Sequence, residues 1–263
     1  MPECDVRPLR TVQITRYVTP LREGGSLPAI AEADDDGLYV VKFRGAGQGA
    51  RALIAELVSG EIARALGLPV PEIVFATLDP DLARTEPDPE IHGLIHDSGG
   101  LNLALDYLPG SVTYDPLVQR LPADLASRIV WFDAYVTNVD RTARNTNMLV
   151  WHRKLWLIDH GATLYLHHSP GWETDGARAR DAFAAIRKHV LVHDATRLEE
   201  IDEALAGKLT PDVITAIVEV VPDSWLTDRS GLEPSQTRAA YRRYLLDRLR
   251  PPRPFLEEAV RDR

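Results

Sequence analysis

A polar loop followed by a short apolar hairpin is the feature that most constrains this chain. The loop, residues 138–147, has the sequence NVDRTARNTN, and Asp159 follows the apolar run that begins at Leu155. Phosphoryl transfer needs an aspartate near the acceptor hydroxyl, and an asparagine and a second aspartate that hold magnesium on the nucleotide. Asp140, Asn145 and Asp159 supply these three groups. The segment therefore predicts a phosphotransfer site.

Residues 147–151 and 155–158 are rich in apolar, β-branched and aromatic residues, so they predict the two strands of a hairpin. Asn145 precedes the first strand and Asp159 ends the second, which places both side chains at one end of the hairpin. Carboxylate and amide oxygens are ligands that suit Mg²⁺. The alternative is an Asx-rich turn whose side chains cap their own backbone. Partners in the N-terminal half favour the metal site.

The first of these partners is Lys42, which stands near the end of the apolar strand predicted over residues 37–43. A lysine in this position pairs the phosphates of a nucleotide when a glutamate from the following helix holds it. The alternative is an edge-strand lysine that discourages aggregation. The strand is expected to pair with residues 28–32.

Residues 50–66 predict the following helix, because apolar residues recur along one stripe and a glycine and a proline come directly after it. Glu56 and Glu61 are both candidates for the partner of Lys42. We expect Glu56, since it lies early enough in the helix to reach back over the lysine strand. It also shares a side of the helix with Gly60, whose small size allows a close approach to that strand. Glu61 is expected to meet solvent or the other lobe.

Two further segments are candidates for contacts with a nucleotide. Gly24, Gly25 and Ser26 precede the predicted strand pair, and their backbone N–H groups are able to face phosphates, although such a cluster is commonly only a turn. The apolar run that begins at residue 101 breaks at a Pro-Gly pair after residue 108, which is consistent with a hinge between two lobes. Backbone groups of the hinge would bind an adenine edge, and a plain strand and turn is the alternative. The hinge candidates are Asp106, Tyr107 and Leu108.

Residues 122–137 predict a helix that positions the catalytic loop. Trp131 and Tyr135 are expected near its rim, and Asp133 either anchors the loop or is a solvated acid. Helices are also predicted over 174–187, 198–206, 211–221 and 233–249. The basic residues of the last helix are expected to form a solvated face, and His189 is expected to be a solvated or capping residue rather than a zinc ligand.

These motifs together resemble the HipA-like kinase domain family, which is related to the phosphatidylinositol 3- and 4-kinases and more distantly to eukaryotic protein kinases. The residues that carry the resemblance are 24–26, 39–43, Glu56 with 66–72, 138–141 with Asn145, and 158–161. The resemblance implies an α+β, bilobal protein kinase-like fold with a strand-rich N-lobe over residues 1–105 and a mostly helical C-lobe over residues 106–263. Two departures are His160, where protein kinases have an aromatic residue, and Thr142, where related families often have histidine.

The composition is that of an ordinary folded protein, with 263 residues, 44% hydrophobic and 26% charged. A net charge of −9 argues against a broad nucleic-acid surface. Cys4 is the only cysteine, which excludes an intramolecular disulfide and a cysteine metal site. No apolar run reaches the roughly 20 residues of a membrane helix, so no membrane span and a cytoplasmic location are expected.

The function expected from these residues is an ATP- and Mg²⁺-dependent phosphotransferase. Lys42 would bind the α- and β-phosphates and be oriented by Glu56, while Asp140 orients the acceptor hydroxyl. Asn145 and Asp159 would hold the magnesium. The acceptor is left open between a protein Ser/Thr, a small molecule and, least expected, a lipid headgroup. The alternative function is a pseudokinase-like nucleotide-binding or protein-interaction module without turnover.

Overall fold

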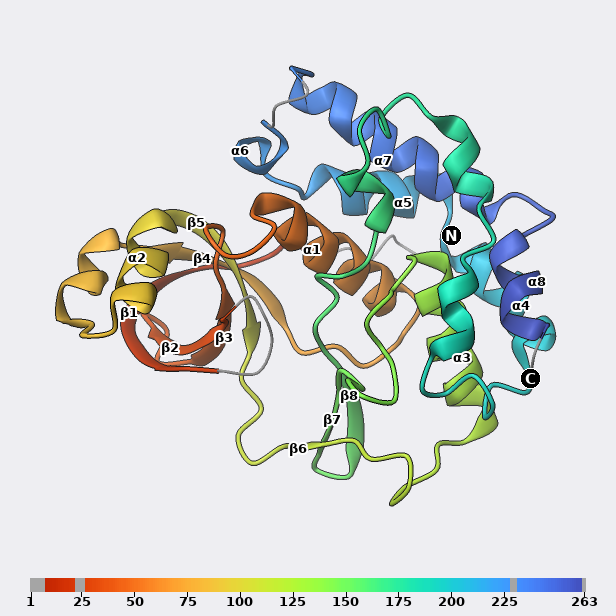
Figure 1. Ribbon diagram of the computed structural model, residues 1–263, viewed down its shortest axis with the longest axis horizontal. Helices are drawn as coiled ribbons and strands as arrows, with labels where there is room; N and C mark the ends of the chain where they lie inside the picture. The colour runs from red at the N-terminus through yellow and green to blue at the C-terminus, as the bar shows by residue number, and fades with distance from the viewer. Residues whose placement is uncertain (1–7, 22–26, 228–230, 262–263) are drawn as a thin grey trace.

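The computed structural model describes residues 8–21, 27–227 and 231–261. A strand-rich N-terminal part and a helical C-terminal part lie side by side (Figure 1). The glycine loop expected at Gly24, Gly25 and Ser26 falls outside the described residues. Within the described ranges, every helix is too short or too polar to span a lipid bilayer.

The described strands of the N-terminal part close into a barrel in the order β1-β2-β3-β5-β4. The closure is made where β1 and β4 pair in parallel, whereas the other neighbours are antiparallel. In β3, Tyr39 and Val41 are buried in the barrel, so the alternation of a strand places Lys42 on the outer face. The strands are β1 (Thr11–Pro20), β2 (Ala29–Ala33), β3 (Leu38–Lys42), β4 (Ile73–Leu78) and β5 (Gly100–Asp106).

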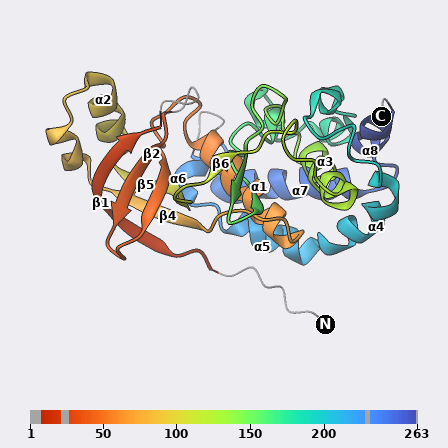
Figure 2. The same ribbon diagram turned by 90° about the horizontal axis from the view of Figure 1, so that it is seen from below.

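Helix α1 (Ala50–Ala65) lies at the centre of the molecule, between the barrel and the C-terminal helices (Figure 1, Figure 2). All its residues from Leu53 to Ala63 are buried. Its apolar side chains belong to the same hydrophobic cluster as the C-terminal helices, while the barrel interior and α2 (Pro89–Asp97) form a second cluster. The predicted helix is confirmed, and it ties the two parts of the molecule together.

The structure excludes one of the two positions expected for Glu61 and corrects the neighbour expected for Gly60. Glu61 does not meet solvent, because it is only 4% exposed and its Oε1 accepts a hydrogen bond from Arg64 Nη1 at 2.8 Å. Gly60 does allow a close approach, but the neighbour is β4, since an added Cβ would clash with Ile73 Cδ1. Over this stretch α1 is buried all round, so no side of the helix is left to solvent.

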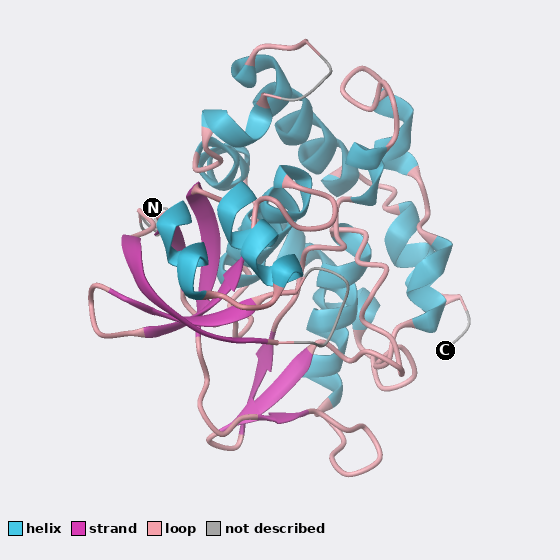
Figure 3. Cartoon of the chain, turned by 60° about the vertical axis from the view of Figure 1, so that its left-hand side comes forward, coloured by secondary structure: helices cyan, strands magenta, loops and turns pink. Residues whose placement is uncertain are grey.

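The C-terminal part is mostly helical, with one small antiparallel sheet in the order β6-β7-β8 (Figure 3). Three of the predicted helices are confirmed as α4, α5 and α7, and Thr210 caps α5 by accepting a hydrogen bond from the backbone N–H of Val213. The elements are β6 (Val112–Thr113), α3 (Ala123–Tyr135), β7 (Met148–Trp151), β8 (Lys154–Leu157), α4 (Leu198–Lys208), α5 (Pro211–Glu219), α6 (Asp223–Leu226), α7 (Pro234–Leu249) and α8 (Pro254–Val260).

The helix predicted over residues 174–187 is wrong. The structure has two short 3-10 turns there, Gly176–Arg180 and Ala184–Lys188, and Asp181 between them is extended. The carbonyl of Asp181 accepts a hydrogen bond from Arg248 Nη1 at 3.0 Å instead of from a following helical turn. A long-range contact therefore overrides the local helix propensity.

The rim positions expected for Trp131 and Tyr135 are also wrong, because both side chains are fully buried. The two rings stack with their centroids 5.5 Å apart. Trp131 Nε1 donates to Asp202 Oδ1 at 2.7 Å, and the Tyr135 hydroxyl donates to the carbonyl of Leu245 at 3.1 Å. Helices α4, α7 and α8 thus cover the side of α3 that the sequence pattern assigned to solvent.

Arg248 of α7 is fully buried, so at this position the solvated basic face predicted for the last helix is wrong. Its guanidinium donates to four backbone carbonyls at 2.9–3.3 Å and lies over the ring of Phe255. A buried arginine is tolerated because its donors are satisfied in this way. The carbonyls belong to Ala134, Tyr135, Ala179 and Asp181.

Replacement of Arg248 by methionine should destabilise the protein by about 3 kcal/mol, because several buried carbonyls would lose their donor. Arg242 of the same helix is exposed, so Arg242→Met is a matched control that should change stability little. Urea unfolding measures both variants. Similar losses in the two variants would contradict the role given to Arg248.

Candidate active site

The hairpin of β7 and β8 places polar residues at one end, as the sequence predicts. Met148 pairs with Leu157, and the backbone N–H of Ile158 donates to the carbonyl of Asn147 at 3.0 Å. Asn147 and Asp159 both have left-handed backbone, with φ values of 47° and 56°. Asn147 directly precedes the paired residues of β7, and Asp159 follows β8. Both side chains therefore lie at the end of the sheet, beside the loop of residues 138–147.

Lys42 joins β3, α1 and this hairpin. Its Nζ lies 2.5 Å from Glu56 Oε2 and 2.5 Å from Asp159 Oδ1. The Glu56 side chain is fully buried and the Lys42 side chain is 14% exposed, whereas the Asp159 side chain is 44% exposed. The expected contact between Lys42 and Glu56 is therefore present.

Charge pairing sets the ionisation of this cluster. Burial alone would lower the pKa of Lys42, but the charges of Glu56 and Asp159 outweigh it and raise that pKa above its usual value. Burial would raise the pKa of Glu56, but Lys42 and His160 hold it at about 2. Both groups are thus charged at neutral pH.

His160 lies on the other side of Glu56. It is fully buried, with Nδ1 3.4 Å from Glu56 Oε1, and its ring meets Phe132 edge-on at 5.6 Å. The histidine therefore keeps the packing of an aromatic residue at this position and adds a polar group that faces the glutamate.

Asp140 lies beside the hairpin end. Asn145 Nδ2 and Asn147 Nδ2 both donate to its Oδ2, at 2.9 and 3.2 Å. Burial raises the pKa of Asp140, and the nearby charge of Asp159 raises it further, against the opposing effect of the two amides. The structure thus brings Asp140, Asn145 and Asp159 together, and it adds Asn147, which the sequence argument missed.

A buried network around Asp133 holds the loop of residues 138–147 in place. Asp133 of α3 is fully buried and accepts hydrogen bonds from Arg141 Nε at 2.6 Å and His189 Nε2 at 2.8 Å. The Asn138 side chain links Asp133 to the backbone N–H of Asp140, with distances of 2.7 and 3.0 Å. Of the two possibilities for Asp133, the anchor is correct.

His189 is buried in this network, so of the two expectations for it the solvated position is wrong, whereas its ring does accept a hydrogen bond from a nearby backbone N–H. The backbone N–H of Leu191 donates to its Nδ1 at 3.0 Å, which leaves the proton on Nε2 for Asp133. Burial would raise the pKa of Asp133, but Arg141 and His189 hold it well below its usual range. No local pattern around His189 signals its contact with Asp133, because the two residues are 56 positions apart in the sequence.

The hinge candidates are partly engaged in the barrel. The backbone N–H of Asp106 donates to the carbonyl of Glu72 at 2.8 Å, and that of Tyr107 to the carbonyl of Leu38 at 2.9 Å. Leu108 is buried. A contact between this segment and an adenine stays a prediction. It would use other backbone groups of the segment, because these two N–H groups already have partners in the barrel.

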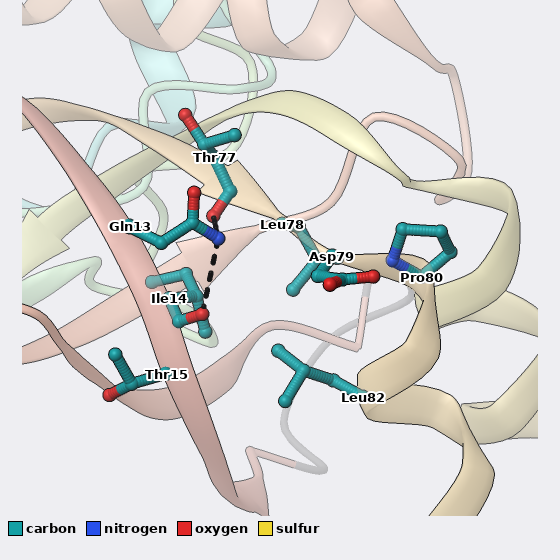
Figure 4. A pocket seen from close by; sticks show the side chains of 8 residues that line it. All are labelled: Gln13, Ile14, Thr15, Thr77, Leu78, Asp79, Pro80 and Leu82. Atoms are coloured by element: carbon teal, nitrogen blue, oxygen red, sulfur yellow. Dashed lines mark hydrogen bonds between the residues drawn. The ribbon is translucent and has the colours of Figure 1, made fainter.

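A hollow of about 520 Å³ lies between β1 and the 3-10 turn Pro80–Thr85, and Figure 4 shows the side chains that line it. Gln13 in its lining donates from Nε2 to the carbonyl of Thr77 at 3.1 Å. It lies where β1 meets β4, and β3 is not a neighbour of either strand in the barrel. None of the charged residues around Lys42 lines it, so it is separate from the candidate site.

Comparisons with known proteins identify the family and the fold of the chain. A model of the HipA-like kinase family matches residues 14–253. The chain belongs to the HipA-like kinase family. A search of curated proteins finds no match.

Solved structures give the fold of this HipA-like kinase. One is the Helicobacter pylori proinflammatory kinase CtkA, with 12% identity, a TM-score of 0.57 and coverage of 96% of each chain. Another is the Golgi casein kinase with Mn/ADP bound, with 13% identity, a TM-score of 0.50, and coverage of 99% of this chain and 75% of that chain. The predicted bilobal kinase-like fold is confirmed, and membership of the HipA-like kinase family supports a kinase-type phosphotransferase.

Glu56 should contribute to acid sensitivity. Its pKa of about 2 in the fold lies below the ordinary 4.5, so it stabilises the folded state above about pH 4.5, and this contribution is lost as the pH falls toward 2. Glu56→Gln should therefore reduce the loss in unfolding free energy between about pH 6 and pH 3. Urea unfolding at several pH values measures this slope.

Glu61 of the same helix provides a control of opposite sign. Burial raises its pKa above 4.5, so its contribution is present at low pH and is lost as the pH rises through the raised pKa. Glu61→Gln should make the acid loss steeper. A change of the same sign in both variants would contradict the charge assignment of Glu56.

Proposed function

We propose that the protein is an ATP- and Mg²⁺-dependent phosphotransferase that moves the γ-phosphate to a hydroxyl group of a protein Ser/Thr or a small molecule. The observation that carries this proposal is the shared position of Lys42 between Glu56 and Asp159, at the hairpin end that also holds Asp140. A cation for phosphates, a carboxylate for a metal and a carboxylate for a hydroxyl proton meet there.

The donor set suits a hard divalent cation. The Asp159 side chain and Asn145 are exposed. Asn145 turns its amide nitrogen to Asp140, so its amide oxygen is left for a cation. Asp140 and Asp159 are close enough for one charge to raise the pKa of the other. Bound Mg²⁺ would neutralise the charge that the phosphates bring to these carboxylates.

Lys42 is already held in a position to meet phosphates. Glu56 is buried on a helix that is itself fixed in the core, so it keeps the ammonium at the end of β3. Asp159 is the more exposed of the two carboxylate partners. We infer that Lys42 exchanges Asp159 for phosphate oxygens when a nucleotide arrives, while Glu56 stays in contact and keeps the lysine charged and oriented.

Asp140 supplies the group for the acceptor. Both amides bind its Oδ2, which leaves Oδ1 for an acceptor hydroxyl. The hydroxyl proton passes to this carboxylate as the oxygen forms its bond to the γ-phosphorus, and the bond from that phosphorus to the leaving ADP oxygen breaks. The raised pKa of Asp140 makes it a better proton acceptor than an ordinary aspartate.

ATP with Mg²⁺ should raise the melting temperature, because a ligand that binds only the folded state stabilises it. Lys42→Ala should weaken this stabilisation, and Asp159→Asn should remove its magnesium dependence. Asp140→Ala should bind ATP like the wild type but lose phosphate transfer or hydrolysis by a factor of roughly 100 or more. Calorimetry measures binding, and labelled γ-phosphate with intact mass measures transfer.

Three results would count against the proposal. The absence of any heat or stabilisation at millimolar ATP would contradict nucleotide binding. Binding without turnover in the wild type would favour the pseudokinase alternative. Equal turnover in the wild type and Asp140→Ala would assign the base to another residue.

A further inference from the structure

We propose that Asn147 is the positioning residue that holds the carboxylate of Asp140 in place for the acceptor hydroxyl. The inference rests on the proposed phosphotransfer function. It adds a residue outside the predicted set of Asp140, Asn145 and Asp159. The observation that carries it is the convergence of two buried supports on the backbone of Asn147, whose side chain then reaches Asp140.

The backbone of Asn147 is fixed from two sides. Its carbonyl accepts a hydrogen bond from the Ile158 N–H at 3.0 Å and another from Arg141 Nη1. Arg141 is fully buried and is itself held by Asp133 through Nε at 2.6 Å. The position of Asn147 is therefore set by both the hairpin and α3, so its amide points at Asp140 Oδ2 from a rigid base.

Asn145 reaches the same oxygen but is not equivalent. Asn145 is exposed, whereas Asn147 is only 8% exposed. An exposed side chain must be ordered each time it makes its contact, while a buried one is ordered already. The amide oxygen of Asn145 is also the group assigned to the cation above. In the proposed reaction Asn147 only donates to Asp140, whereas Asn145 also binds the cation.

The backbone conformation gives an independent reason to look for a role of this side chain. Asn147 has φ of 47°, in the left-handed region that glycine adopts without strain and that asparagine tolerates better than most residues with a Cβ. An amide side chain is therefore present where the backbone favours glycine. Such positions occur at functional sites, where the side chain serves the reaction at some cost in stability.

Replacement of Asn147 by glycine tests the inference, because it suits the backbone conformation and removes the side-chain contact with Asp140. Asn147→Gly removes the amide and relieves the backbone, so its melting temperature should stay within about 4 °C of the wild type. Arg153→Gly is the matched control, because Arg153 is exposed at the turn of the same hairpin and has φ of 62°. It relieves the same kind of strain without touching Asp140.

In the full chain, kcat for phosphate transfer at saturating ATP should fall roughly 10- to 100-fold in Asn147→Gly, because Asp140 would be misplaced for its proton transfer. The Kd for ATP with Mg²⁺, measured by calorimetry, should stay within about twofold. Arg153→Gly should keep both values. Asn147→Asp should lose kcat as well, because a second carboxylate would face Asp140.

Each other outcome overturns the inference. An unchanged kcat in Asn147→Gly means that Asn145 alone holds Asp140. A melting temperature that falls much further than in Arg153→Gly means that Asn147 is a structural residue. A wild type that binds no ATP and transfers no phosphate overturns the proposed function together with this inference, whereas an active wild type with an equally active Asn147→Gly overturns this inference alone.

Discussion

The ammonium of Lys42, shared between Glu56 and Asp159, is the interaction on which the rest of the site depends. Moving charged groups out of water is costly, and the cost is offset only if the partners are close and well oriented. The lysine stands at the end of β3, the glutamate on α1 and the aspartate after β8. The cluster therefore forms only when the barrel, the central helix and the hairpin come together so that the Lys42 ammonium lies 2.5 Å from both carboxylates.

Glu56 is the buried anchor of Lys42, and a second buried carboxylate, Asp133, anchors the acceptor side of the site. It holds Arg141, His189 and Asn138 through hydrogen bonds of 2.6–2.8 Å, and through them the loop that carries Asp140. The two anchors lie on different helices, α1 and α3. The hairpin end connects them, because Asp159 contacts Lys42 while Asn147 contacts Asp140. Lys42 and Asp140 are thus each held in place by a buried carboxylate, Glu56 for the lysine and Asp133 for the aspartate.

The sequence predicts the parts of this arrangement that depend on local patterns. The lysine strand, the helix of Glu56 and the hairpin follow from alternation, helical periodicity and strand composition over short windows. Asp140 and Asn145 lie only five residues apart in one loop. Local rules leave the role of Asp133 open and do not reach Arg248 and His189, because the burial of these residues depends on elements that come together only in the fold. For the same reason, solvent contact of Glu61, one of the two positions expected for it, is wrong.

The central claim is that Lys42 and Glu56 act as one coupled unit that joins the barrel to α1. A double-mutant cycle with Lys42→Met, Glu56→Gln and the double variant, measured by urea unfolding at neutral pH, tests it most directly. The account predicts that the double variant is less destabilised than the sum of the single variants by at least about 1 kcal/mol. Losses that add to within about 0.5 kcal/mol would contradict it.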